Sequence, residues 1–325
     1  MSAHPKIVFG GGAFMDTDHY ATLDTVKEVL DILEKEGVES IDTATIYGNS
    51  EDSLGNVGAA ERFSIDTKLP GGFSPEPTTK ESVIATAEKS LQDLKTDQVD
   101  VYYLHAPDRR SPLEDILSSI NALHQSGKFK RFGLSNFLAA EVEEVVRVSR
   151  EKGYVVPTVY QGNYSAVARR AESEILPTLR KHGIAFYAYS PIAGGFLTKD
   201  IEQIMAGGDG RWDPATPLGQ LYHALYNKSS MREGLKLWGE TAQEVGIPKG
   251  ELAYRWVTYN SALKGELGDA VIVGSRIADQ LTETLGWLKK GPLSAEIAAR
   301  VEEVWKIVES DAPLDNFNPT TESAK

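Results

Sequence analysis

The chain of 325 residues contains no cysteine. This absence excludes disulfide bonds, thiolate metal sites and cysteine nucleophiles, and it fits a reducing compartment. No apolar stretch is long enough to span a bilayer, and the N-terminal segment MSAHPKIVFGGGAF lacks the basic flank and long apolar core of a signal peptide. The sequence therefore predicts a cytoplasmic protein without a membrane anchor.

Positive charge is also scarce. The chain has 34 lysine and arginine residues against 47 acidic residues, which gives a formal net charge of -13. Nucleic acids and anionic membranes would be repelled by this charge, and no basic cluster offsets it, so neither is expected as a partner. The six histidines are scattered, and no H-x-H pattern or carboxylate cluster predicts a metal site.

A dinucleotide-binding turn of the Rossmann type is missing as well. Gly10, Gly11 and Gly12 follow the first predicted strand, but they lack the G-x-G-x-x-G spacing. The final dozen residues show no regular pattern.

What the sequence has is a regular alternation of β and α patterns. Strands are predicted at residues 7–14, 40–44, 63–69, 99–105, 131–136, 158–163, 185–191 and 269–274. Helices are predicted at residues 22–38, 51–60, 78–94, 113–125, 139–152, 172–182, 230–245 and 249–260, with further helices after the last strand. Eight alternating units predict a closed (β/α)8 barrel that forms one domain over residues 1–325. Residues 192–230 are expected to form a long irregular loop after the seventh strand.

Four ionisable residues fall at the carboxyl ends of the predicted strands, where barrel enzymes carry their chemistry. Asp42 ends the second strand and Tyr47 follows it, Lys68 ends the third, and His105 ends the fourth. Each residue alone has an ordinary explanation, since a terminal lysine is usually solvated, a histidine after apolar residues usually packs, and an aspartate before a turn is often a cap. Their convergence on one rim favours a functional site.

These four residues could form a proton relay. A free phenol has a pKa of about 10, so Tyr47 alone would hold its proton too tightly to be a fast acid. Lys68 beside the phenol is expected to lower the pKa of Tyr47, while Asp42 pairs with Lys68 and holds it in place. His105 would orient an incoming carbonyl group. No amino acid supplies hydride, so a reduction at this site requires a cofactor.

The same motifs resemble the catalytic tetrad of the aldo-keto reductases, a nicotinamide-dependent (β/α)8 family. The resemblance rests on Asp42 with Tyr47-Gly48, on Lys68, and on His105 within LHAPD. It continues in order through GLSNF (133–137), YQGNY (160–164), YAYSPIAGGFLT (187–198) and VGSR (273–276). The AGG after the seventh strand and the segment RWDPATPLGQLYHALY are similar to the aflatoxin-aldehyde reductase branch and its fungal relatives.

The resemblance implies a role for each matching position. Tyr47 would be the general acid in carbonyl reduction, tuned by Lys68 and Asp42, with His105 orienting the carbonyl. Ser135, Asn136 and Gln161 would bind the nicotinamide carboxamide, and Tyr189 would stack on the nicotinamide ring. The backbone from Ile192 to Leu197 would lie near the pyrophosphate. The full set of implied cofactor contacts is Ser135, Asn136, Gln161, Tyr189, Ser190, Ile192, Gly194, Leu197, Gly274, Ser275, Arg276 and Gln280.

The implied cofactor is NADPH/NADP, with Ser275 and Arg276 meeting the adenosine 2′-phosphate. Many family members have Lys-Ser, a later arginine and an asparagine in this segment, where this chain has Gly274-Ser275, Gln280 and Thr284. Arg276 could replace the missing cations, because a planar guanidinium suits both a phosphate and an adenine ring.

The expected partner is a small-molecule carbonyl substrate, bound by a monomer or a homodimer. An apolar pocket for medium-sized aldehydes is predicted, and Arg211 is expected either to bind a substrate carboxylate or to form a loop salt bridge. The other predicted contacts could equally pack the loop onto the barrel. The predicted substrate contacts are Phe14, Met15, Ile46, Arg211, Trp212, Tyr222 and Tyr226.

Three other classes of protein stay open at this stage. An aldolase or lyase on the same barrel would use Lys68 to form a Schiff base. A cofactor-binding regulatory subunit, resembling the potassium-channel β-subunits, would act through a protein partner. A metal hydrolase is disfavoured by the lack of metal ligands at the strand ends.

Overall fold

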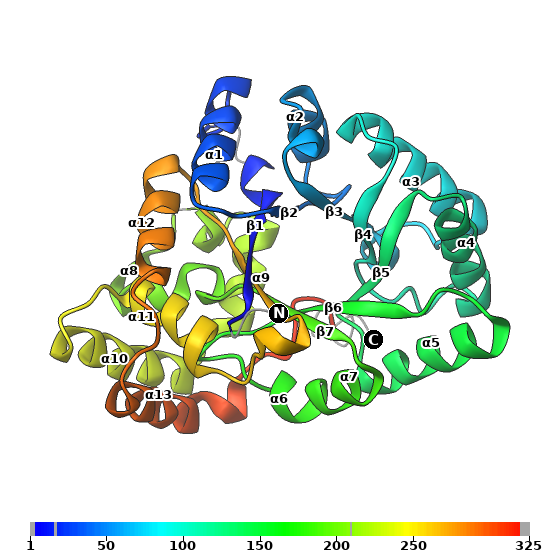
Figure 1. Cartoon of the computed structure of the whole chain (residues 1–325). Coiled ribbons are helices and arrows are strands. Elements are labelled where there is room, and N and C mark those ends of the chain that lie inside the picture. The colour runs from blue at the N-terminus through cyan, green and yellow to red at the C-terminus, as the bar shows by residue number, and fades with distance from the viewer. Residues whose placement is uncertain (1–3, 16–17, 209, 319–325) are drawn as a thin grey trace.

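The computed structural model describes residues 4–15, 18–208 and 210–318. Its strands form a closed parallel barrel in which each strand pairs with its neighbour in sequence and β8 pairs with β1, as Figure 1 shows. The predicted (β/α)8 barrel is confirmed. The strands are β1 (Lys6–Gly10), β2 (Ser40–Asp42), β3 (Ser64–Leu69), β4 (Val99–Leu104), β5 (Phe129–Ser135), β6 (Pro157–Asn163), β7 (Ala185–Tyr189) and β8 (Ala270–Val273).

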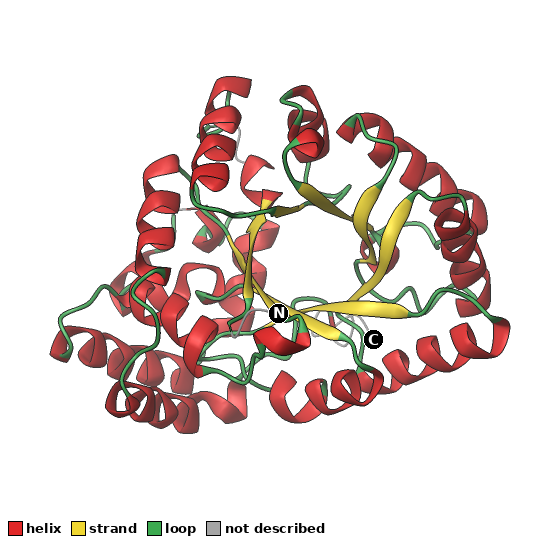
Figure 2. Ribbon diagram, viewed as in Figure 1, coloured by secondary structure: helices red, strands yellow, loops and turns green. Residues whose placement is uncertain are grey.

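Helices surround the barrel as an outer ring, which Figure 2 shows in red around the yellow strands. They are α1 (Leu23–Lys35), α2 (Ser50–Asn56), α3 (Lys80–Leu94), α4 (Leu113–Gln125), α5 (Ala139–Lys152), α6 (Ala171–Glu174), α7 (Leu176–His182), α8 (Ile201–Ala206), α9 (Pro217–Tyr226), α10 (Ser229–Glu244), α11 (Lys249–Arg255), α12 (Ala278–Leu288) and α13 (Ala295–Val308). Within the described part of the chain, none of these helices has the length and apolar composition needed to cross a bilayer.

The helices form where local signals and burial agree. The side chain of Thr22 caps α1 by accepting a hydrogen bond from the Thr25 backbone N–H. Val26, Val29 and Leu33 recur at helical spacing and are fully buried against the barrel. Thr79 and Ser82 form a reciprocal capping box at the start of α3.

The first strand is shorter than predicted. β1 ends at Gly10, and residues 11–15 form the 3-10 helix η1 (Gly11–Met15). The reason lies in the neighbouring strand, because β2 ends at Asp42, which pairs with Gly10, and offers no ladder beyond it. The Gly11 carbonyl instead accepts a hydrogen bond from the Ser50 hydroxyl at 2.9 Å, which ties η1 to α2.

Two helical predictions also need correction. Residues 192–230 are not irregular, because they contain α8, α9 and the 3-10 helices η4 (Ala193–Thr198) and η5 (Gly210–Trp212). Thr216 caps α9 and Pro217 is its first residue, and both are signals of a helix start. The glycines around this segment made it look irregular in the sequence. The predicted helix at 172–182 is broken into α6 and α7 at Ile175, because Pro177 cannot supply the backbone N–H that a continuous helix needs.

The barrel interior is packed rather than open. A cluster of apolar and tyrosine side chains from several strands fills it, including Val8, Val101, Tyr103, Tyr187 and Ile272. The helices bury a larger core against the outer face of the strands. Polar side chains gather at the carboxyl ends of the strands, on top of this inner cluster.

Candidate active site

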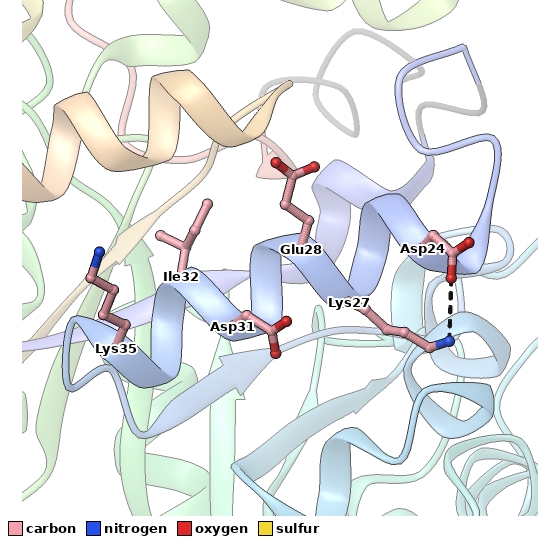
Figure 3. Close-up of a pocket in the computed structure, with 6 residues that line it drawn as sticks. All are labelled: Asp24, Lys27, Glu28, Asp31, Ile32 and Lys35. Atoms are coloured by element: carbon pink, nitrogen blue, oxygen red, sulfur yellow. Dashed lines mark hydrogen bonds and ion pairs between the residues drawn. The ribbon is translucent and has the colours of Figure 1, made fainter.

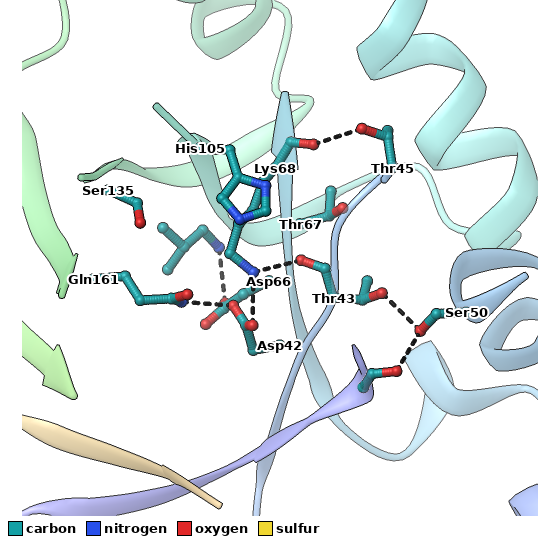
Figure 4. A network of polar contacts seen from close by, with 12 residues as sticks. Asp42, Thr43, Thr45, Ser50, Asp66, Thr67, Lys68, His105, Ser135 and Gln161 are labelled. Carbon is teal, nitrogen blue, oxygen red and sulfur yellow. Dashed lines mark hydrogen bonds and ion pairs between the residues drawn. The ribbon is translucent and has the colours of Figure 1, made fainter. Parts of the chain in front are cut away.

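The ion pair of Asp42 and Lys68 lies at the carboxyl rim of the barrel, on the adjacent strands β2 and β3. The Lys68 ammonium donates to Asp42 Oδ2 at 2.6 Å and to the Thr43 carbonyl at 2.7 Å. Both side chains are buried. Figure 4 shows this network, in which the predicted Asp42–Lys68 contact is present.

Gln161 completes the coordination of Asp42. Its side-chain amide donates to Asp42 Oδ1 at 2.8 Å, so each carboxylate oxygen has a different partner. The sequence predicted Gln161 only as a cofactor contact. Its position on β6, inside the barrel, lets it reach across to β2 and hold Asp42 in place.

Tyr47 lies next to this pair. The Lys68 ammonium is 5.0 Å from the centroid of the Tyr47 ring, and the His105 ring lies edge-on at 5.7 Å. Although part of its surface is open to solvent, burial among side chains raises the pKa of Tyr47; Lys68 lowers it and Asp42 raises it. Lys68 lowers this pKa as expected, but the net pKa is raised, because Asp42 offsets part of the effect of Lys68 and burial outweighs the rest.

His105 is held as a neutral imidazole. Burial and the nearby Lys68 charge keep the pKa of His105 well below its usual range. Its Nδ1 atom is buried and has no hydrogen-bond partner among the described residues. A neutral imidazole beside Tyr47 can donate one hydrogen bond to a carbonyl oxygen without adding charge to the site.

Asn136 connects the strand ends that the sequence assigned to the nicotinamide. Its backbone adopts φ 61°, a left-handed conformation that is uncommon outside glycine. Its amide donates to the His105 carbonyl at 2.8 Å and to Ser135 Oγ at 3.1 Å, and its Oδ1 accepts from the Tyr189 hydroxyl at 2.8 Å. The three predicted nicotinamide contacts on β5 and β7 are thus joined in one rigid group, and their contact with a cofactor stays a prediction.

The turn after β7 has an unusual backbone. Ser190, Ala193, Gly194 and Gly195 all have positive φ angles, between 50° and 94°. The two glycines adopt this conformation freely, whereas it strains the serine and the alanine. Within the turn, the N–H groups of Gly195 and Leu197 donate to the Ile192 carbonyl at 3.0 and 3.3 Å, and a contact with a pyrophosphate stays a prediction.

The segment after β8 carries the predicted 2′-phosphate contacts. Ser275 is buried and its hydroxyl has no hydrogen-bond partner among the described residues, while its carbonyl accepts from Tyr20 at 3.1 Å. Arg276 is exposed, and its backbone N–H donates to the Gln280 side chain at 3.1 Å. A buried hydroxyl that lacks a partner, next to a guanidinium, fits a phosphate ligand.

The predicted substrate contacts divide into two groups. Arg211 is exposed, donates to the Tyr222 hydroxyl at 3.1 Å, and lies close enough to Tyr47 for its charge to lower the pKa of that phenol. Met15 and Ile46 are exposed as well. Tyr222 is only 2% exposed and its ring packs on Gly194, so the prediction that it contacts the substrate is corrected as well.

Phe14, Trp212 and Tyr226 are corrections to the substrate prediction. Phe14 packs edge-on against Tyr20, while Trp212 and Tyr226 both stack on Phe196. All three are no more than 2% exposed, so they offer almost no surface to a substrate. Their aromatic rings hold the loops on the barrel instead.

Two phenylalanines near His105 were not predicted from the sequence as site residues. Phe73 lies 5.0 Å from the His105 ring and 4.9 Å from Phe317, measured between ring centroids. Residues 314–318 are ordered on the rim, where the Asn316 N–H donates to the Tyr189 hydroxyl and the Asn318 side chain donates to the Asn136 carbonyl. This position on the rim was not predicted, because the last dozen residues show no regular pattern. The FN pair at 317–318 was the one signal in that segment.

Two surface hollows lie outside this cluster. Figure 3 shows a charged one along α1, lined by Asp24, Lys27, Glu28, Asp31, Ile32 and Lys35. A second, of about 280 Å³, lies behind His105 and is lined in part by Leu104, Ala106 and Pro107. No group of three or more metal-ligating side chains occurs within residues 4–15, 18–208 and 210–318.

The fold and the site together define a (β/α)8 barrel with a phenol, an imidazole and a buried ion pair at its carboxyl rim. The family model described as the aldo/keto reductase family matches residues 6–306. The oxidoreductase sirO of Leptosphaeria maculans is 39% identical over 96% of this chain and 98% of its own length. Aflatoxin B1 aldehyde reductase member 4 of Homo sapiens is 35% identical over 96% of this chain and 97% of its own length.

The chain therefore belongs to the aldo/keto reductase family, and it is an oxidoreductase that acts on carbonyl groups. The relatives include both aflatoxin aldehyde reductases and fungal aldo-keto reductases, among them pigE of Monascus ruber at 30% identity over 91% of this chain.

Proposed function

We propose that this protein reduces aldehydes and some ketones to alcohols with NADPH, and that Tyr47 is the general acid. The observation that carries the proposal is the position of the Lys68 ammonium, which is bonded to Asp42 at 2.6 Å and lies 5.0 Å from the Tyr47 ring. A cation in this place stabilises the phenolate that remains when Tyr47 gives up its proton. The other phenol beside a cation at the rim, Tyr222 with Arg211, is almost fully buried and is less suited to meet a substrate.

Each residue of the group then has a distinct task. Tyr47 donates its proton to the carbonyl oxygen as negative charge develops there, and Lys68 stabilises the phenolate that is left. Asp42 and the Thr43 carbonyl hold the ammonium in position. His105, as a neutral imidazole, donates a hydrogen bond to the same carbonyl oxygen and orients it. When bound, the nicotinamide cofactor supplies the hydride that no side chain can supply.

The cofactor would be held along the rim from β5 to β8. Ser135, Asn136 and Gln161 would meet the carboxamide, and the strained turn that follows Tyr189 would meet the pyrophosphate. The buried hydroxyl of Ser275, which has no partner among the described residues, and the exposed Arg276 support a 2′-phosphate, and hence NADPH over NADH.

The substrate proposed is a medium-sized aldehyde, with a carboxylate-bearing aldehyde as the class best suited to Arg211. Phe73 and His105 provide one aromatic wall, and the Arg211–Tyr222 pair faces Tyr47. The aflatoxin aldehyde reductases among the relatives support an aldehyde substrate. The enzyme is proposed to work in the cytoplasm as a monomer or a homodimer.

The test is NADPH oxidation by the purified protein with aromatic, aliphatic and carboxylate-bearing aldehydes, run beside NADH. Tyr47→Phe is expected to lower turnover by about 100-fold or more while cofactor binding is retained. Tyr102→Phe is the matched control, because it removes a buried hydroxyl outside the site that also lacks a partner among the described residues. Turnover that persists in Tyr47→Phe would refute the assignment.

Tight NADPH binding without turnover on any aldehyde would favour the regulatory alternative that resembles the potassium-channel β-subunits. Borohydride trapping of a substrate on Lys68 would favour the aldolase alternative instead.

A further inference from the structure

A second buried carboxyl group lies beside the ion pair and has no role in the mechanism above. Asp66 is two residues before Lys68 on β3, so both side chains point into the barrel. It is paired in register with Asp42 on the neighbouring strand, and it is 1% exposed. Figure 4 shows Asp66 close to Asp42 and Lys68.

One oxygen of Asp66 is bonded and the other is not. Oδ1 accepts a hydrogen bond from the Val101 backbone N–H at 3.1 Å. Oδ2 is buried and has no hydrogen-bond partner among the described residues, and the same holds for the hydroxyl of Tyr103. A buried carboxylate with a free oxygen would be costly, whereas a carboxylic acid carries a proton on that oxygen.

Neither nearby cation is hydrogen-bonded to Asp66, although the charge of Arg131 lowers the pKa of Asp66 in part. Lys68 is bonded to Asp42, and Arg131 forms a two-pronged ion pair with Asp100 at 3.1 and 2.8 Å. The remaining titratable neighbours that face it are the phenols of Tyr103 on β4 and Tyr187 on β7. Burial, followed by the charges of Asp42 and Asp100, holds the pKa of Asp66 well above its usual range.

We propose that Asp66 is a further positioning residue of this site, a second carboxyl group that acts through Lys68 to hold the proton on Tyr47. In its protonated form it leaves Lys68 with Asp42 as its one carboxylate partner. When Asp66 is ionised, the Lys68 ammonium is shared between Asp66 and Asp42. Less positive charge is then available to stabilise the phenolate of Tyr47. The inference rests on the function proposed above.

The order in which Asp66 and Tyr47 lose their protons decides whether Asp66 favours reduction or oxidation. A carboxylic acid starts from a pKa of about 3.9 and a phenol from about 10, and the pKa of each is raised here, so Asp66 is expected to lose its proton before Tyr47 as the pH rises. The new negative charge then keeps Tyr47 protonated. Because reduction needs the phenol and alcohol oxidation needs the phenolate, Asp66 favours reduction at alkaline pH.

The first test asks whether Asp66 carries a proton, and it does not depend on activity. The unfolded chain releases this proton above a pH of about 3.9, whereas the folded protein keeps it, so Asp66 makes the fold less stable as the pH rises. The Asp66→Asn variant keeps the acceptor for Val101 and cannot ionise. The melting temperature of Asp66→Asn, relative to that of the wild type, is expected to increase progressively from about pH 5 to about pH 8.

The exposed Asp97→Asn variant is the control for the loss of one carboxylate. A gain for Asp66→Asn that is the same at every pH would overturn the proposal, because it would mean that Asp66 is ionised in the folded protein. Asp66→Ser is a second neutral variant with an acceptor, for use if the asparagine is not accommodated.

The second test measures the effect on Tyr47 directly. Phenolate absorbance is titrated as the difference between proteins with Tyr47 and with Phe at that position, in the wild type and in Asp66→Asn. The apparent pKa of Tyr47 is expected to fall by about one unit or more in Asp66→Asn, since a nearby negative charge is lost. A merely structural role would leave the two titrations coincident, and that result would overturn the proposal.

The pH profile of alcohol oxidation connects the inference to the proposed function. Its alkaline rise is expected to move to lower pH in Asp66→Asn by the same amount as the titration. If both physical tests succeed and no alcohol or aldehyde is turned over, the assignment of Asp66 stands and the proposed function fails.

Discussion

Lys68 on the adjacent strand and Gln161 on the far side of the barrel hold the two oxygens of Asp42, at 2.6 and 2.8 Å. The buried carboxylate is thereby fixed, and the ammonium that it pairs with lies over the rings of Tyr47 and Tyr103, at 5.0 and 5.6 Å. Such a pair is more important for position than for stability, because the cost of burying both charges offsets most of their attraction.

Removing one member of this pair should be far worse than removing both. Lys68→Met leaves Asp42 as a buried charge without a cation, and it is expected to destabilise the fold by about 3–5 kcal/mol. The double variant with Asp42→Asn should recover most of that loss, although neither variant should turn over substrate. Chemical denaturation measures the difference.

The control for this experiment is Lys89→Met, which breaks the exposed Lys89–Asp93 pair on α3 and should cost no more than about 1 kcal/mol. If the double variant is as unstable as Lys68→Met, the charge imbalance is not the cause.

Arg211 should distinguish substrates by charge. Arg211→Met is expected to raise KM for carboxylate-bearing aldehydes by about tenfold or more, since a hydrogen bond to a charged group is lost. Neutral aldehydes of the same size should show little change. Tyr222→Phe separates the two roles of the guanidinium, because it removes only the Tyr222 hydroxyl that Arg211 contacts. Equal losses for both substrate classes would assign Arg211 to the loop alone.

Arg276 should distinguish the two nicotinamide cofactors. Arg276→Ala is expected to weaken NADPH binding by about tenfold or more and to leave NADH nearly unchanged, because only NADPH carries the 2′-phosphate. Fluorescence titration of both cofactors gives the two Kd values. Arg147→Ala on α5, where the arginine pairs with Glu144 and Glu151, controls for the loss of a surface charge. A parallel loss for both cofactors would contradict a phosphate contact.

His105 should make the fold acid-sensitive. Its pKa lies well below the usual value, so below a pH of about 6.5 the unfolded chain takes up a proton that the folded protein does not. The stability present above that pH is therefore lost as the pH falls toward the folded pKa, by about 1.4 kcal/mol per pH unit. His105→Asn should remove this slope in the free energy of unfolding. Identical slopes in the two proteins would mean that His105 is charged in the fold.

The barrel and its rim could be predicted from the sequence because they depend on short-range patterns. Alternating β and α periods predicted each strand and most helices to within a few residues, and Asp42, Lys68 and His105 were each found at the end of a strand as expected. Strand ends of a parallel barrel meet at one rim whatever the loops do, so the cluster followed from topology.

The errors arose where a residue depends on distant neighbours. β1 stops at Gly10 because β2 stops at Asp42, a limit that no local pattern carries. Phe317 reaches Phe73 from 244 positions along the chain, a separation over which periodicity says nothing. The burial of Phe14 and Trp212 likewise follows from which loops pack together, because aromatic residues suit a core and a pocket equally well.

The sequence alone determined the architecture and the residue types at the rim, since both follow from local periodicity and the order of the motifs. Only the tertiary structure decided the charge states. Burial raises the pKa of Tyr47 despite Lys68 and the pKa of Asp66 despite Arg131, and Gln161 reaches Asp42 across 119 positions. These properties depend on how much water and which charges surround a group once the chain has closed, and spacing along the chain does not encode either.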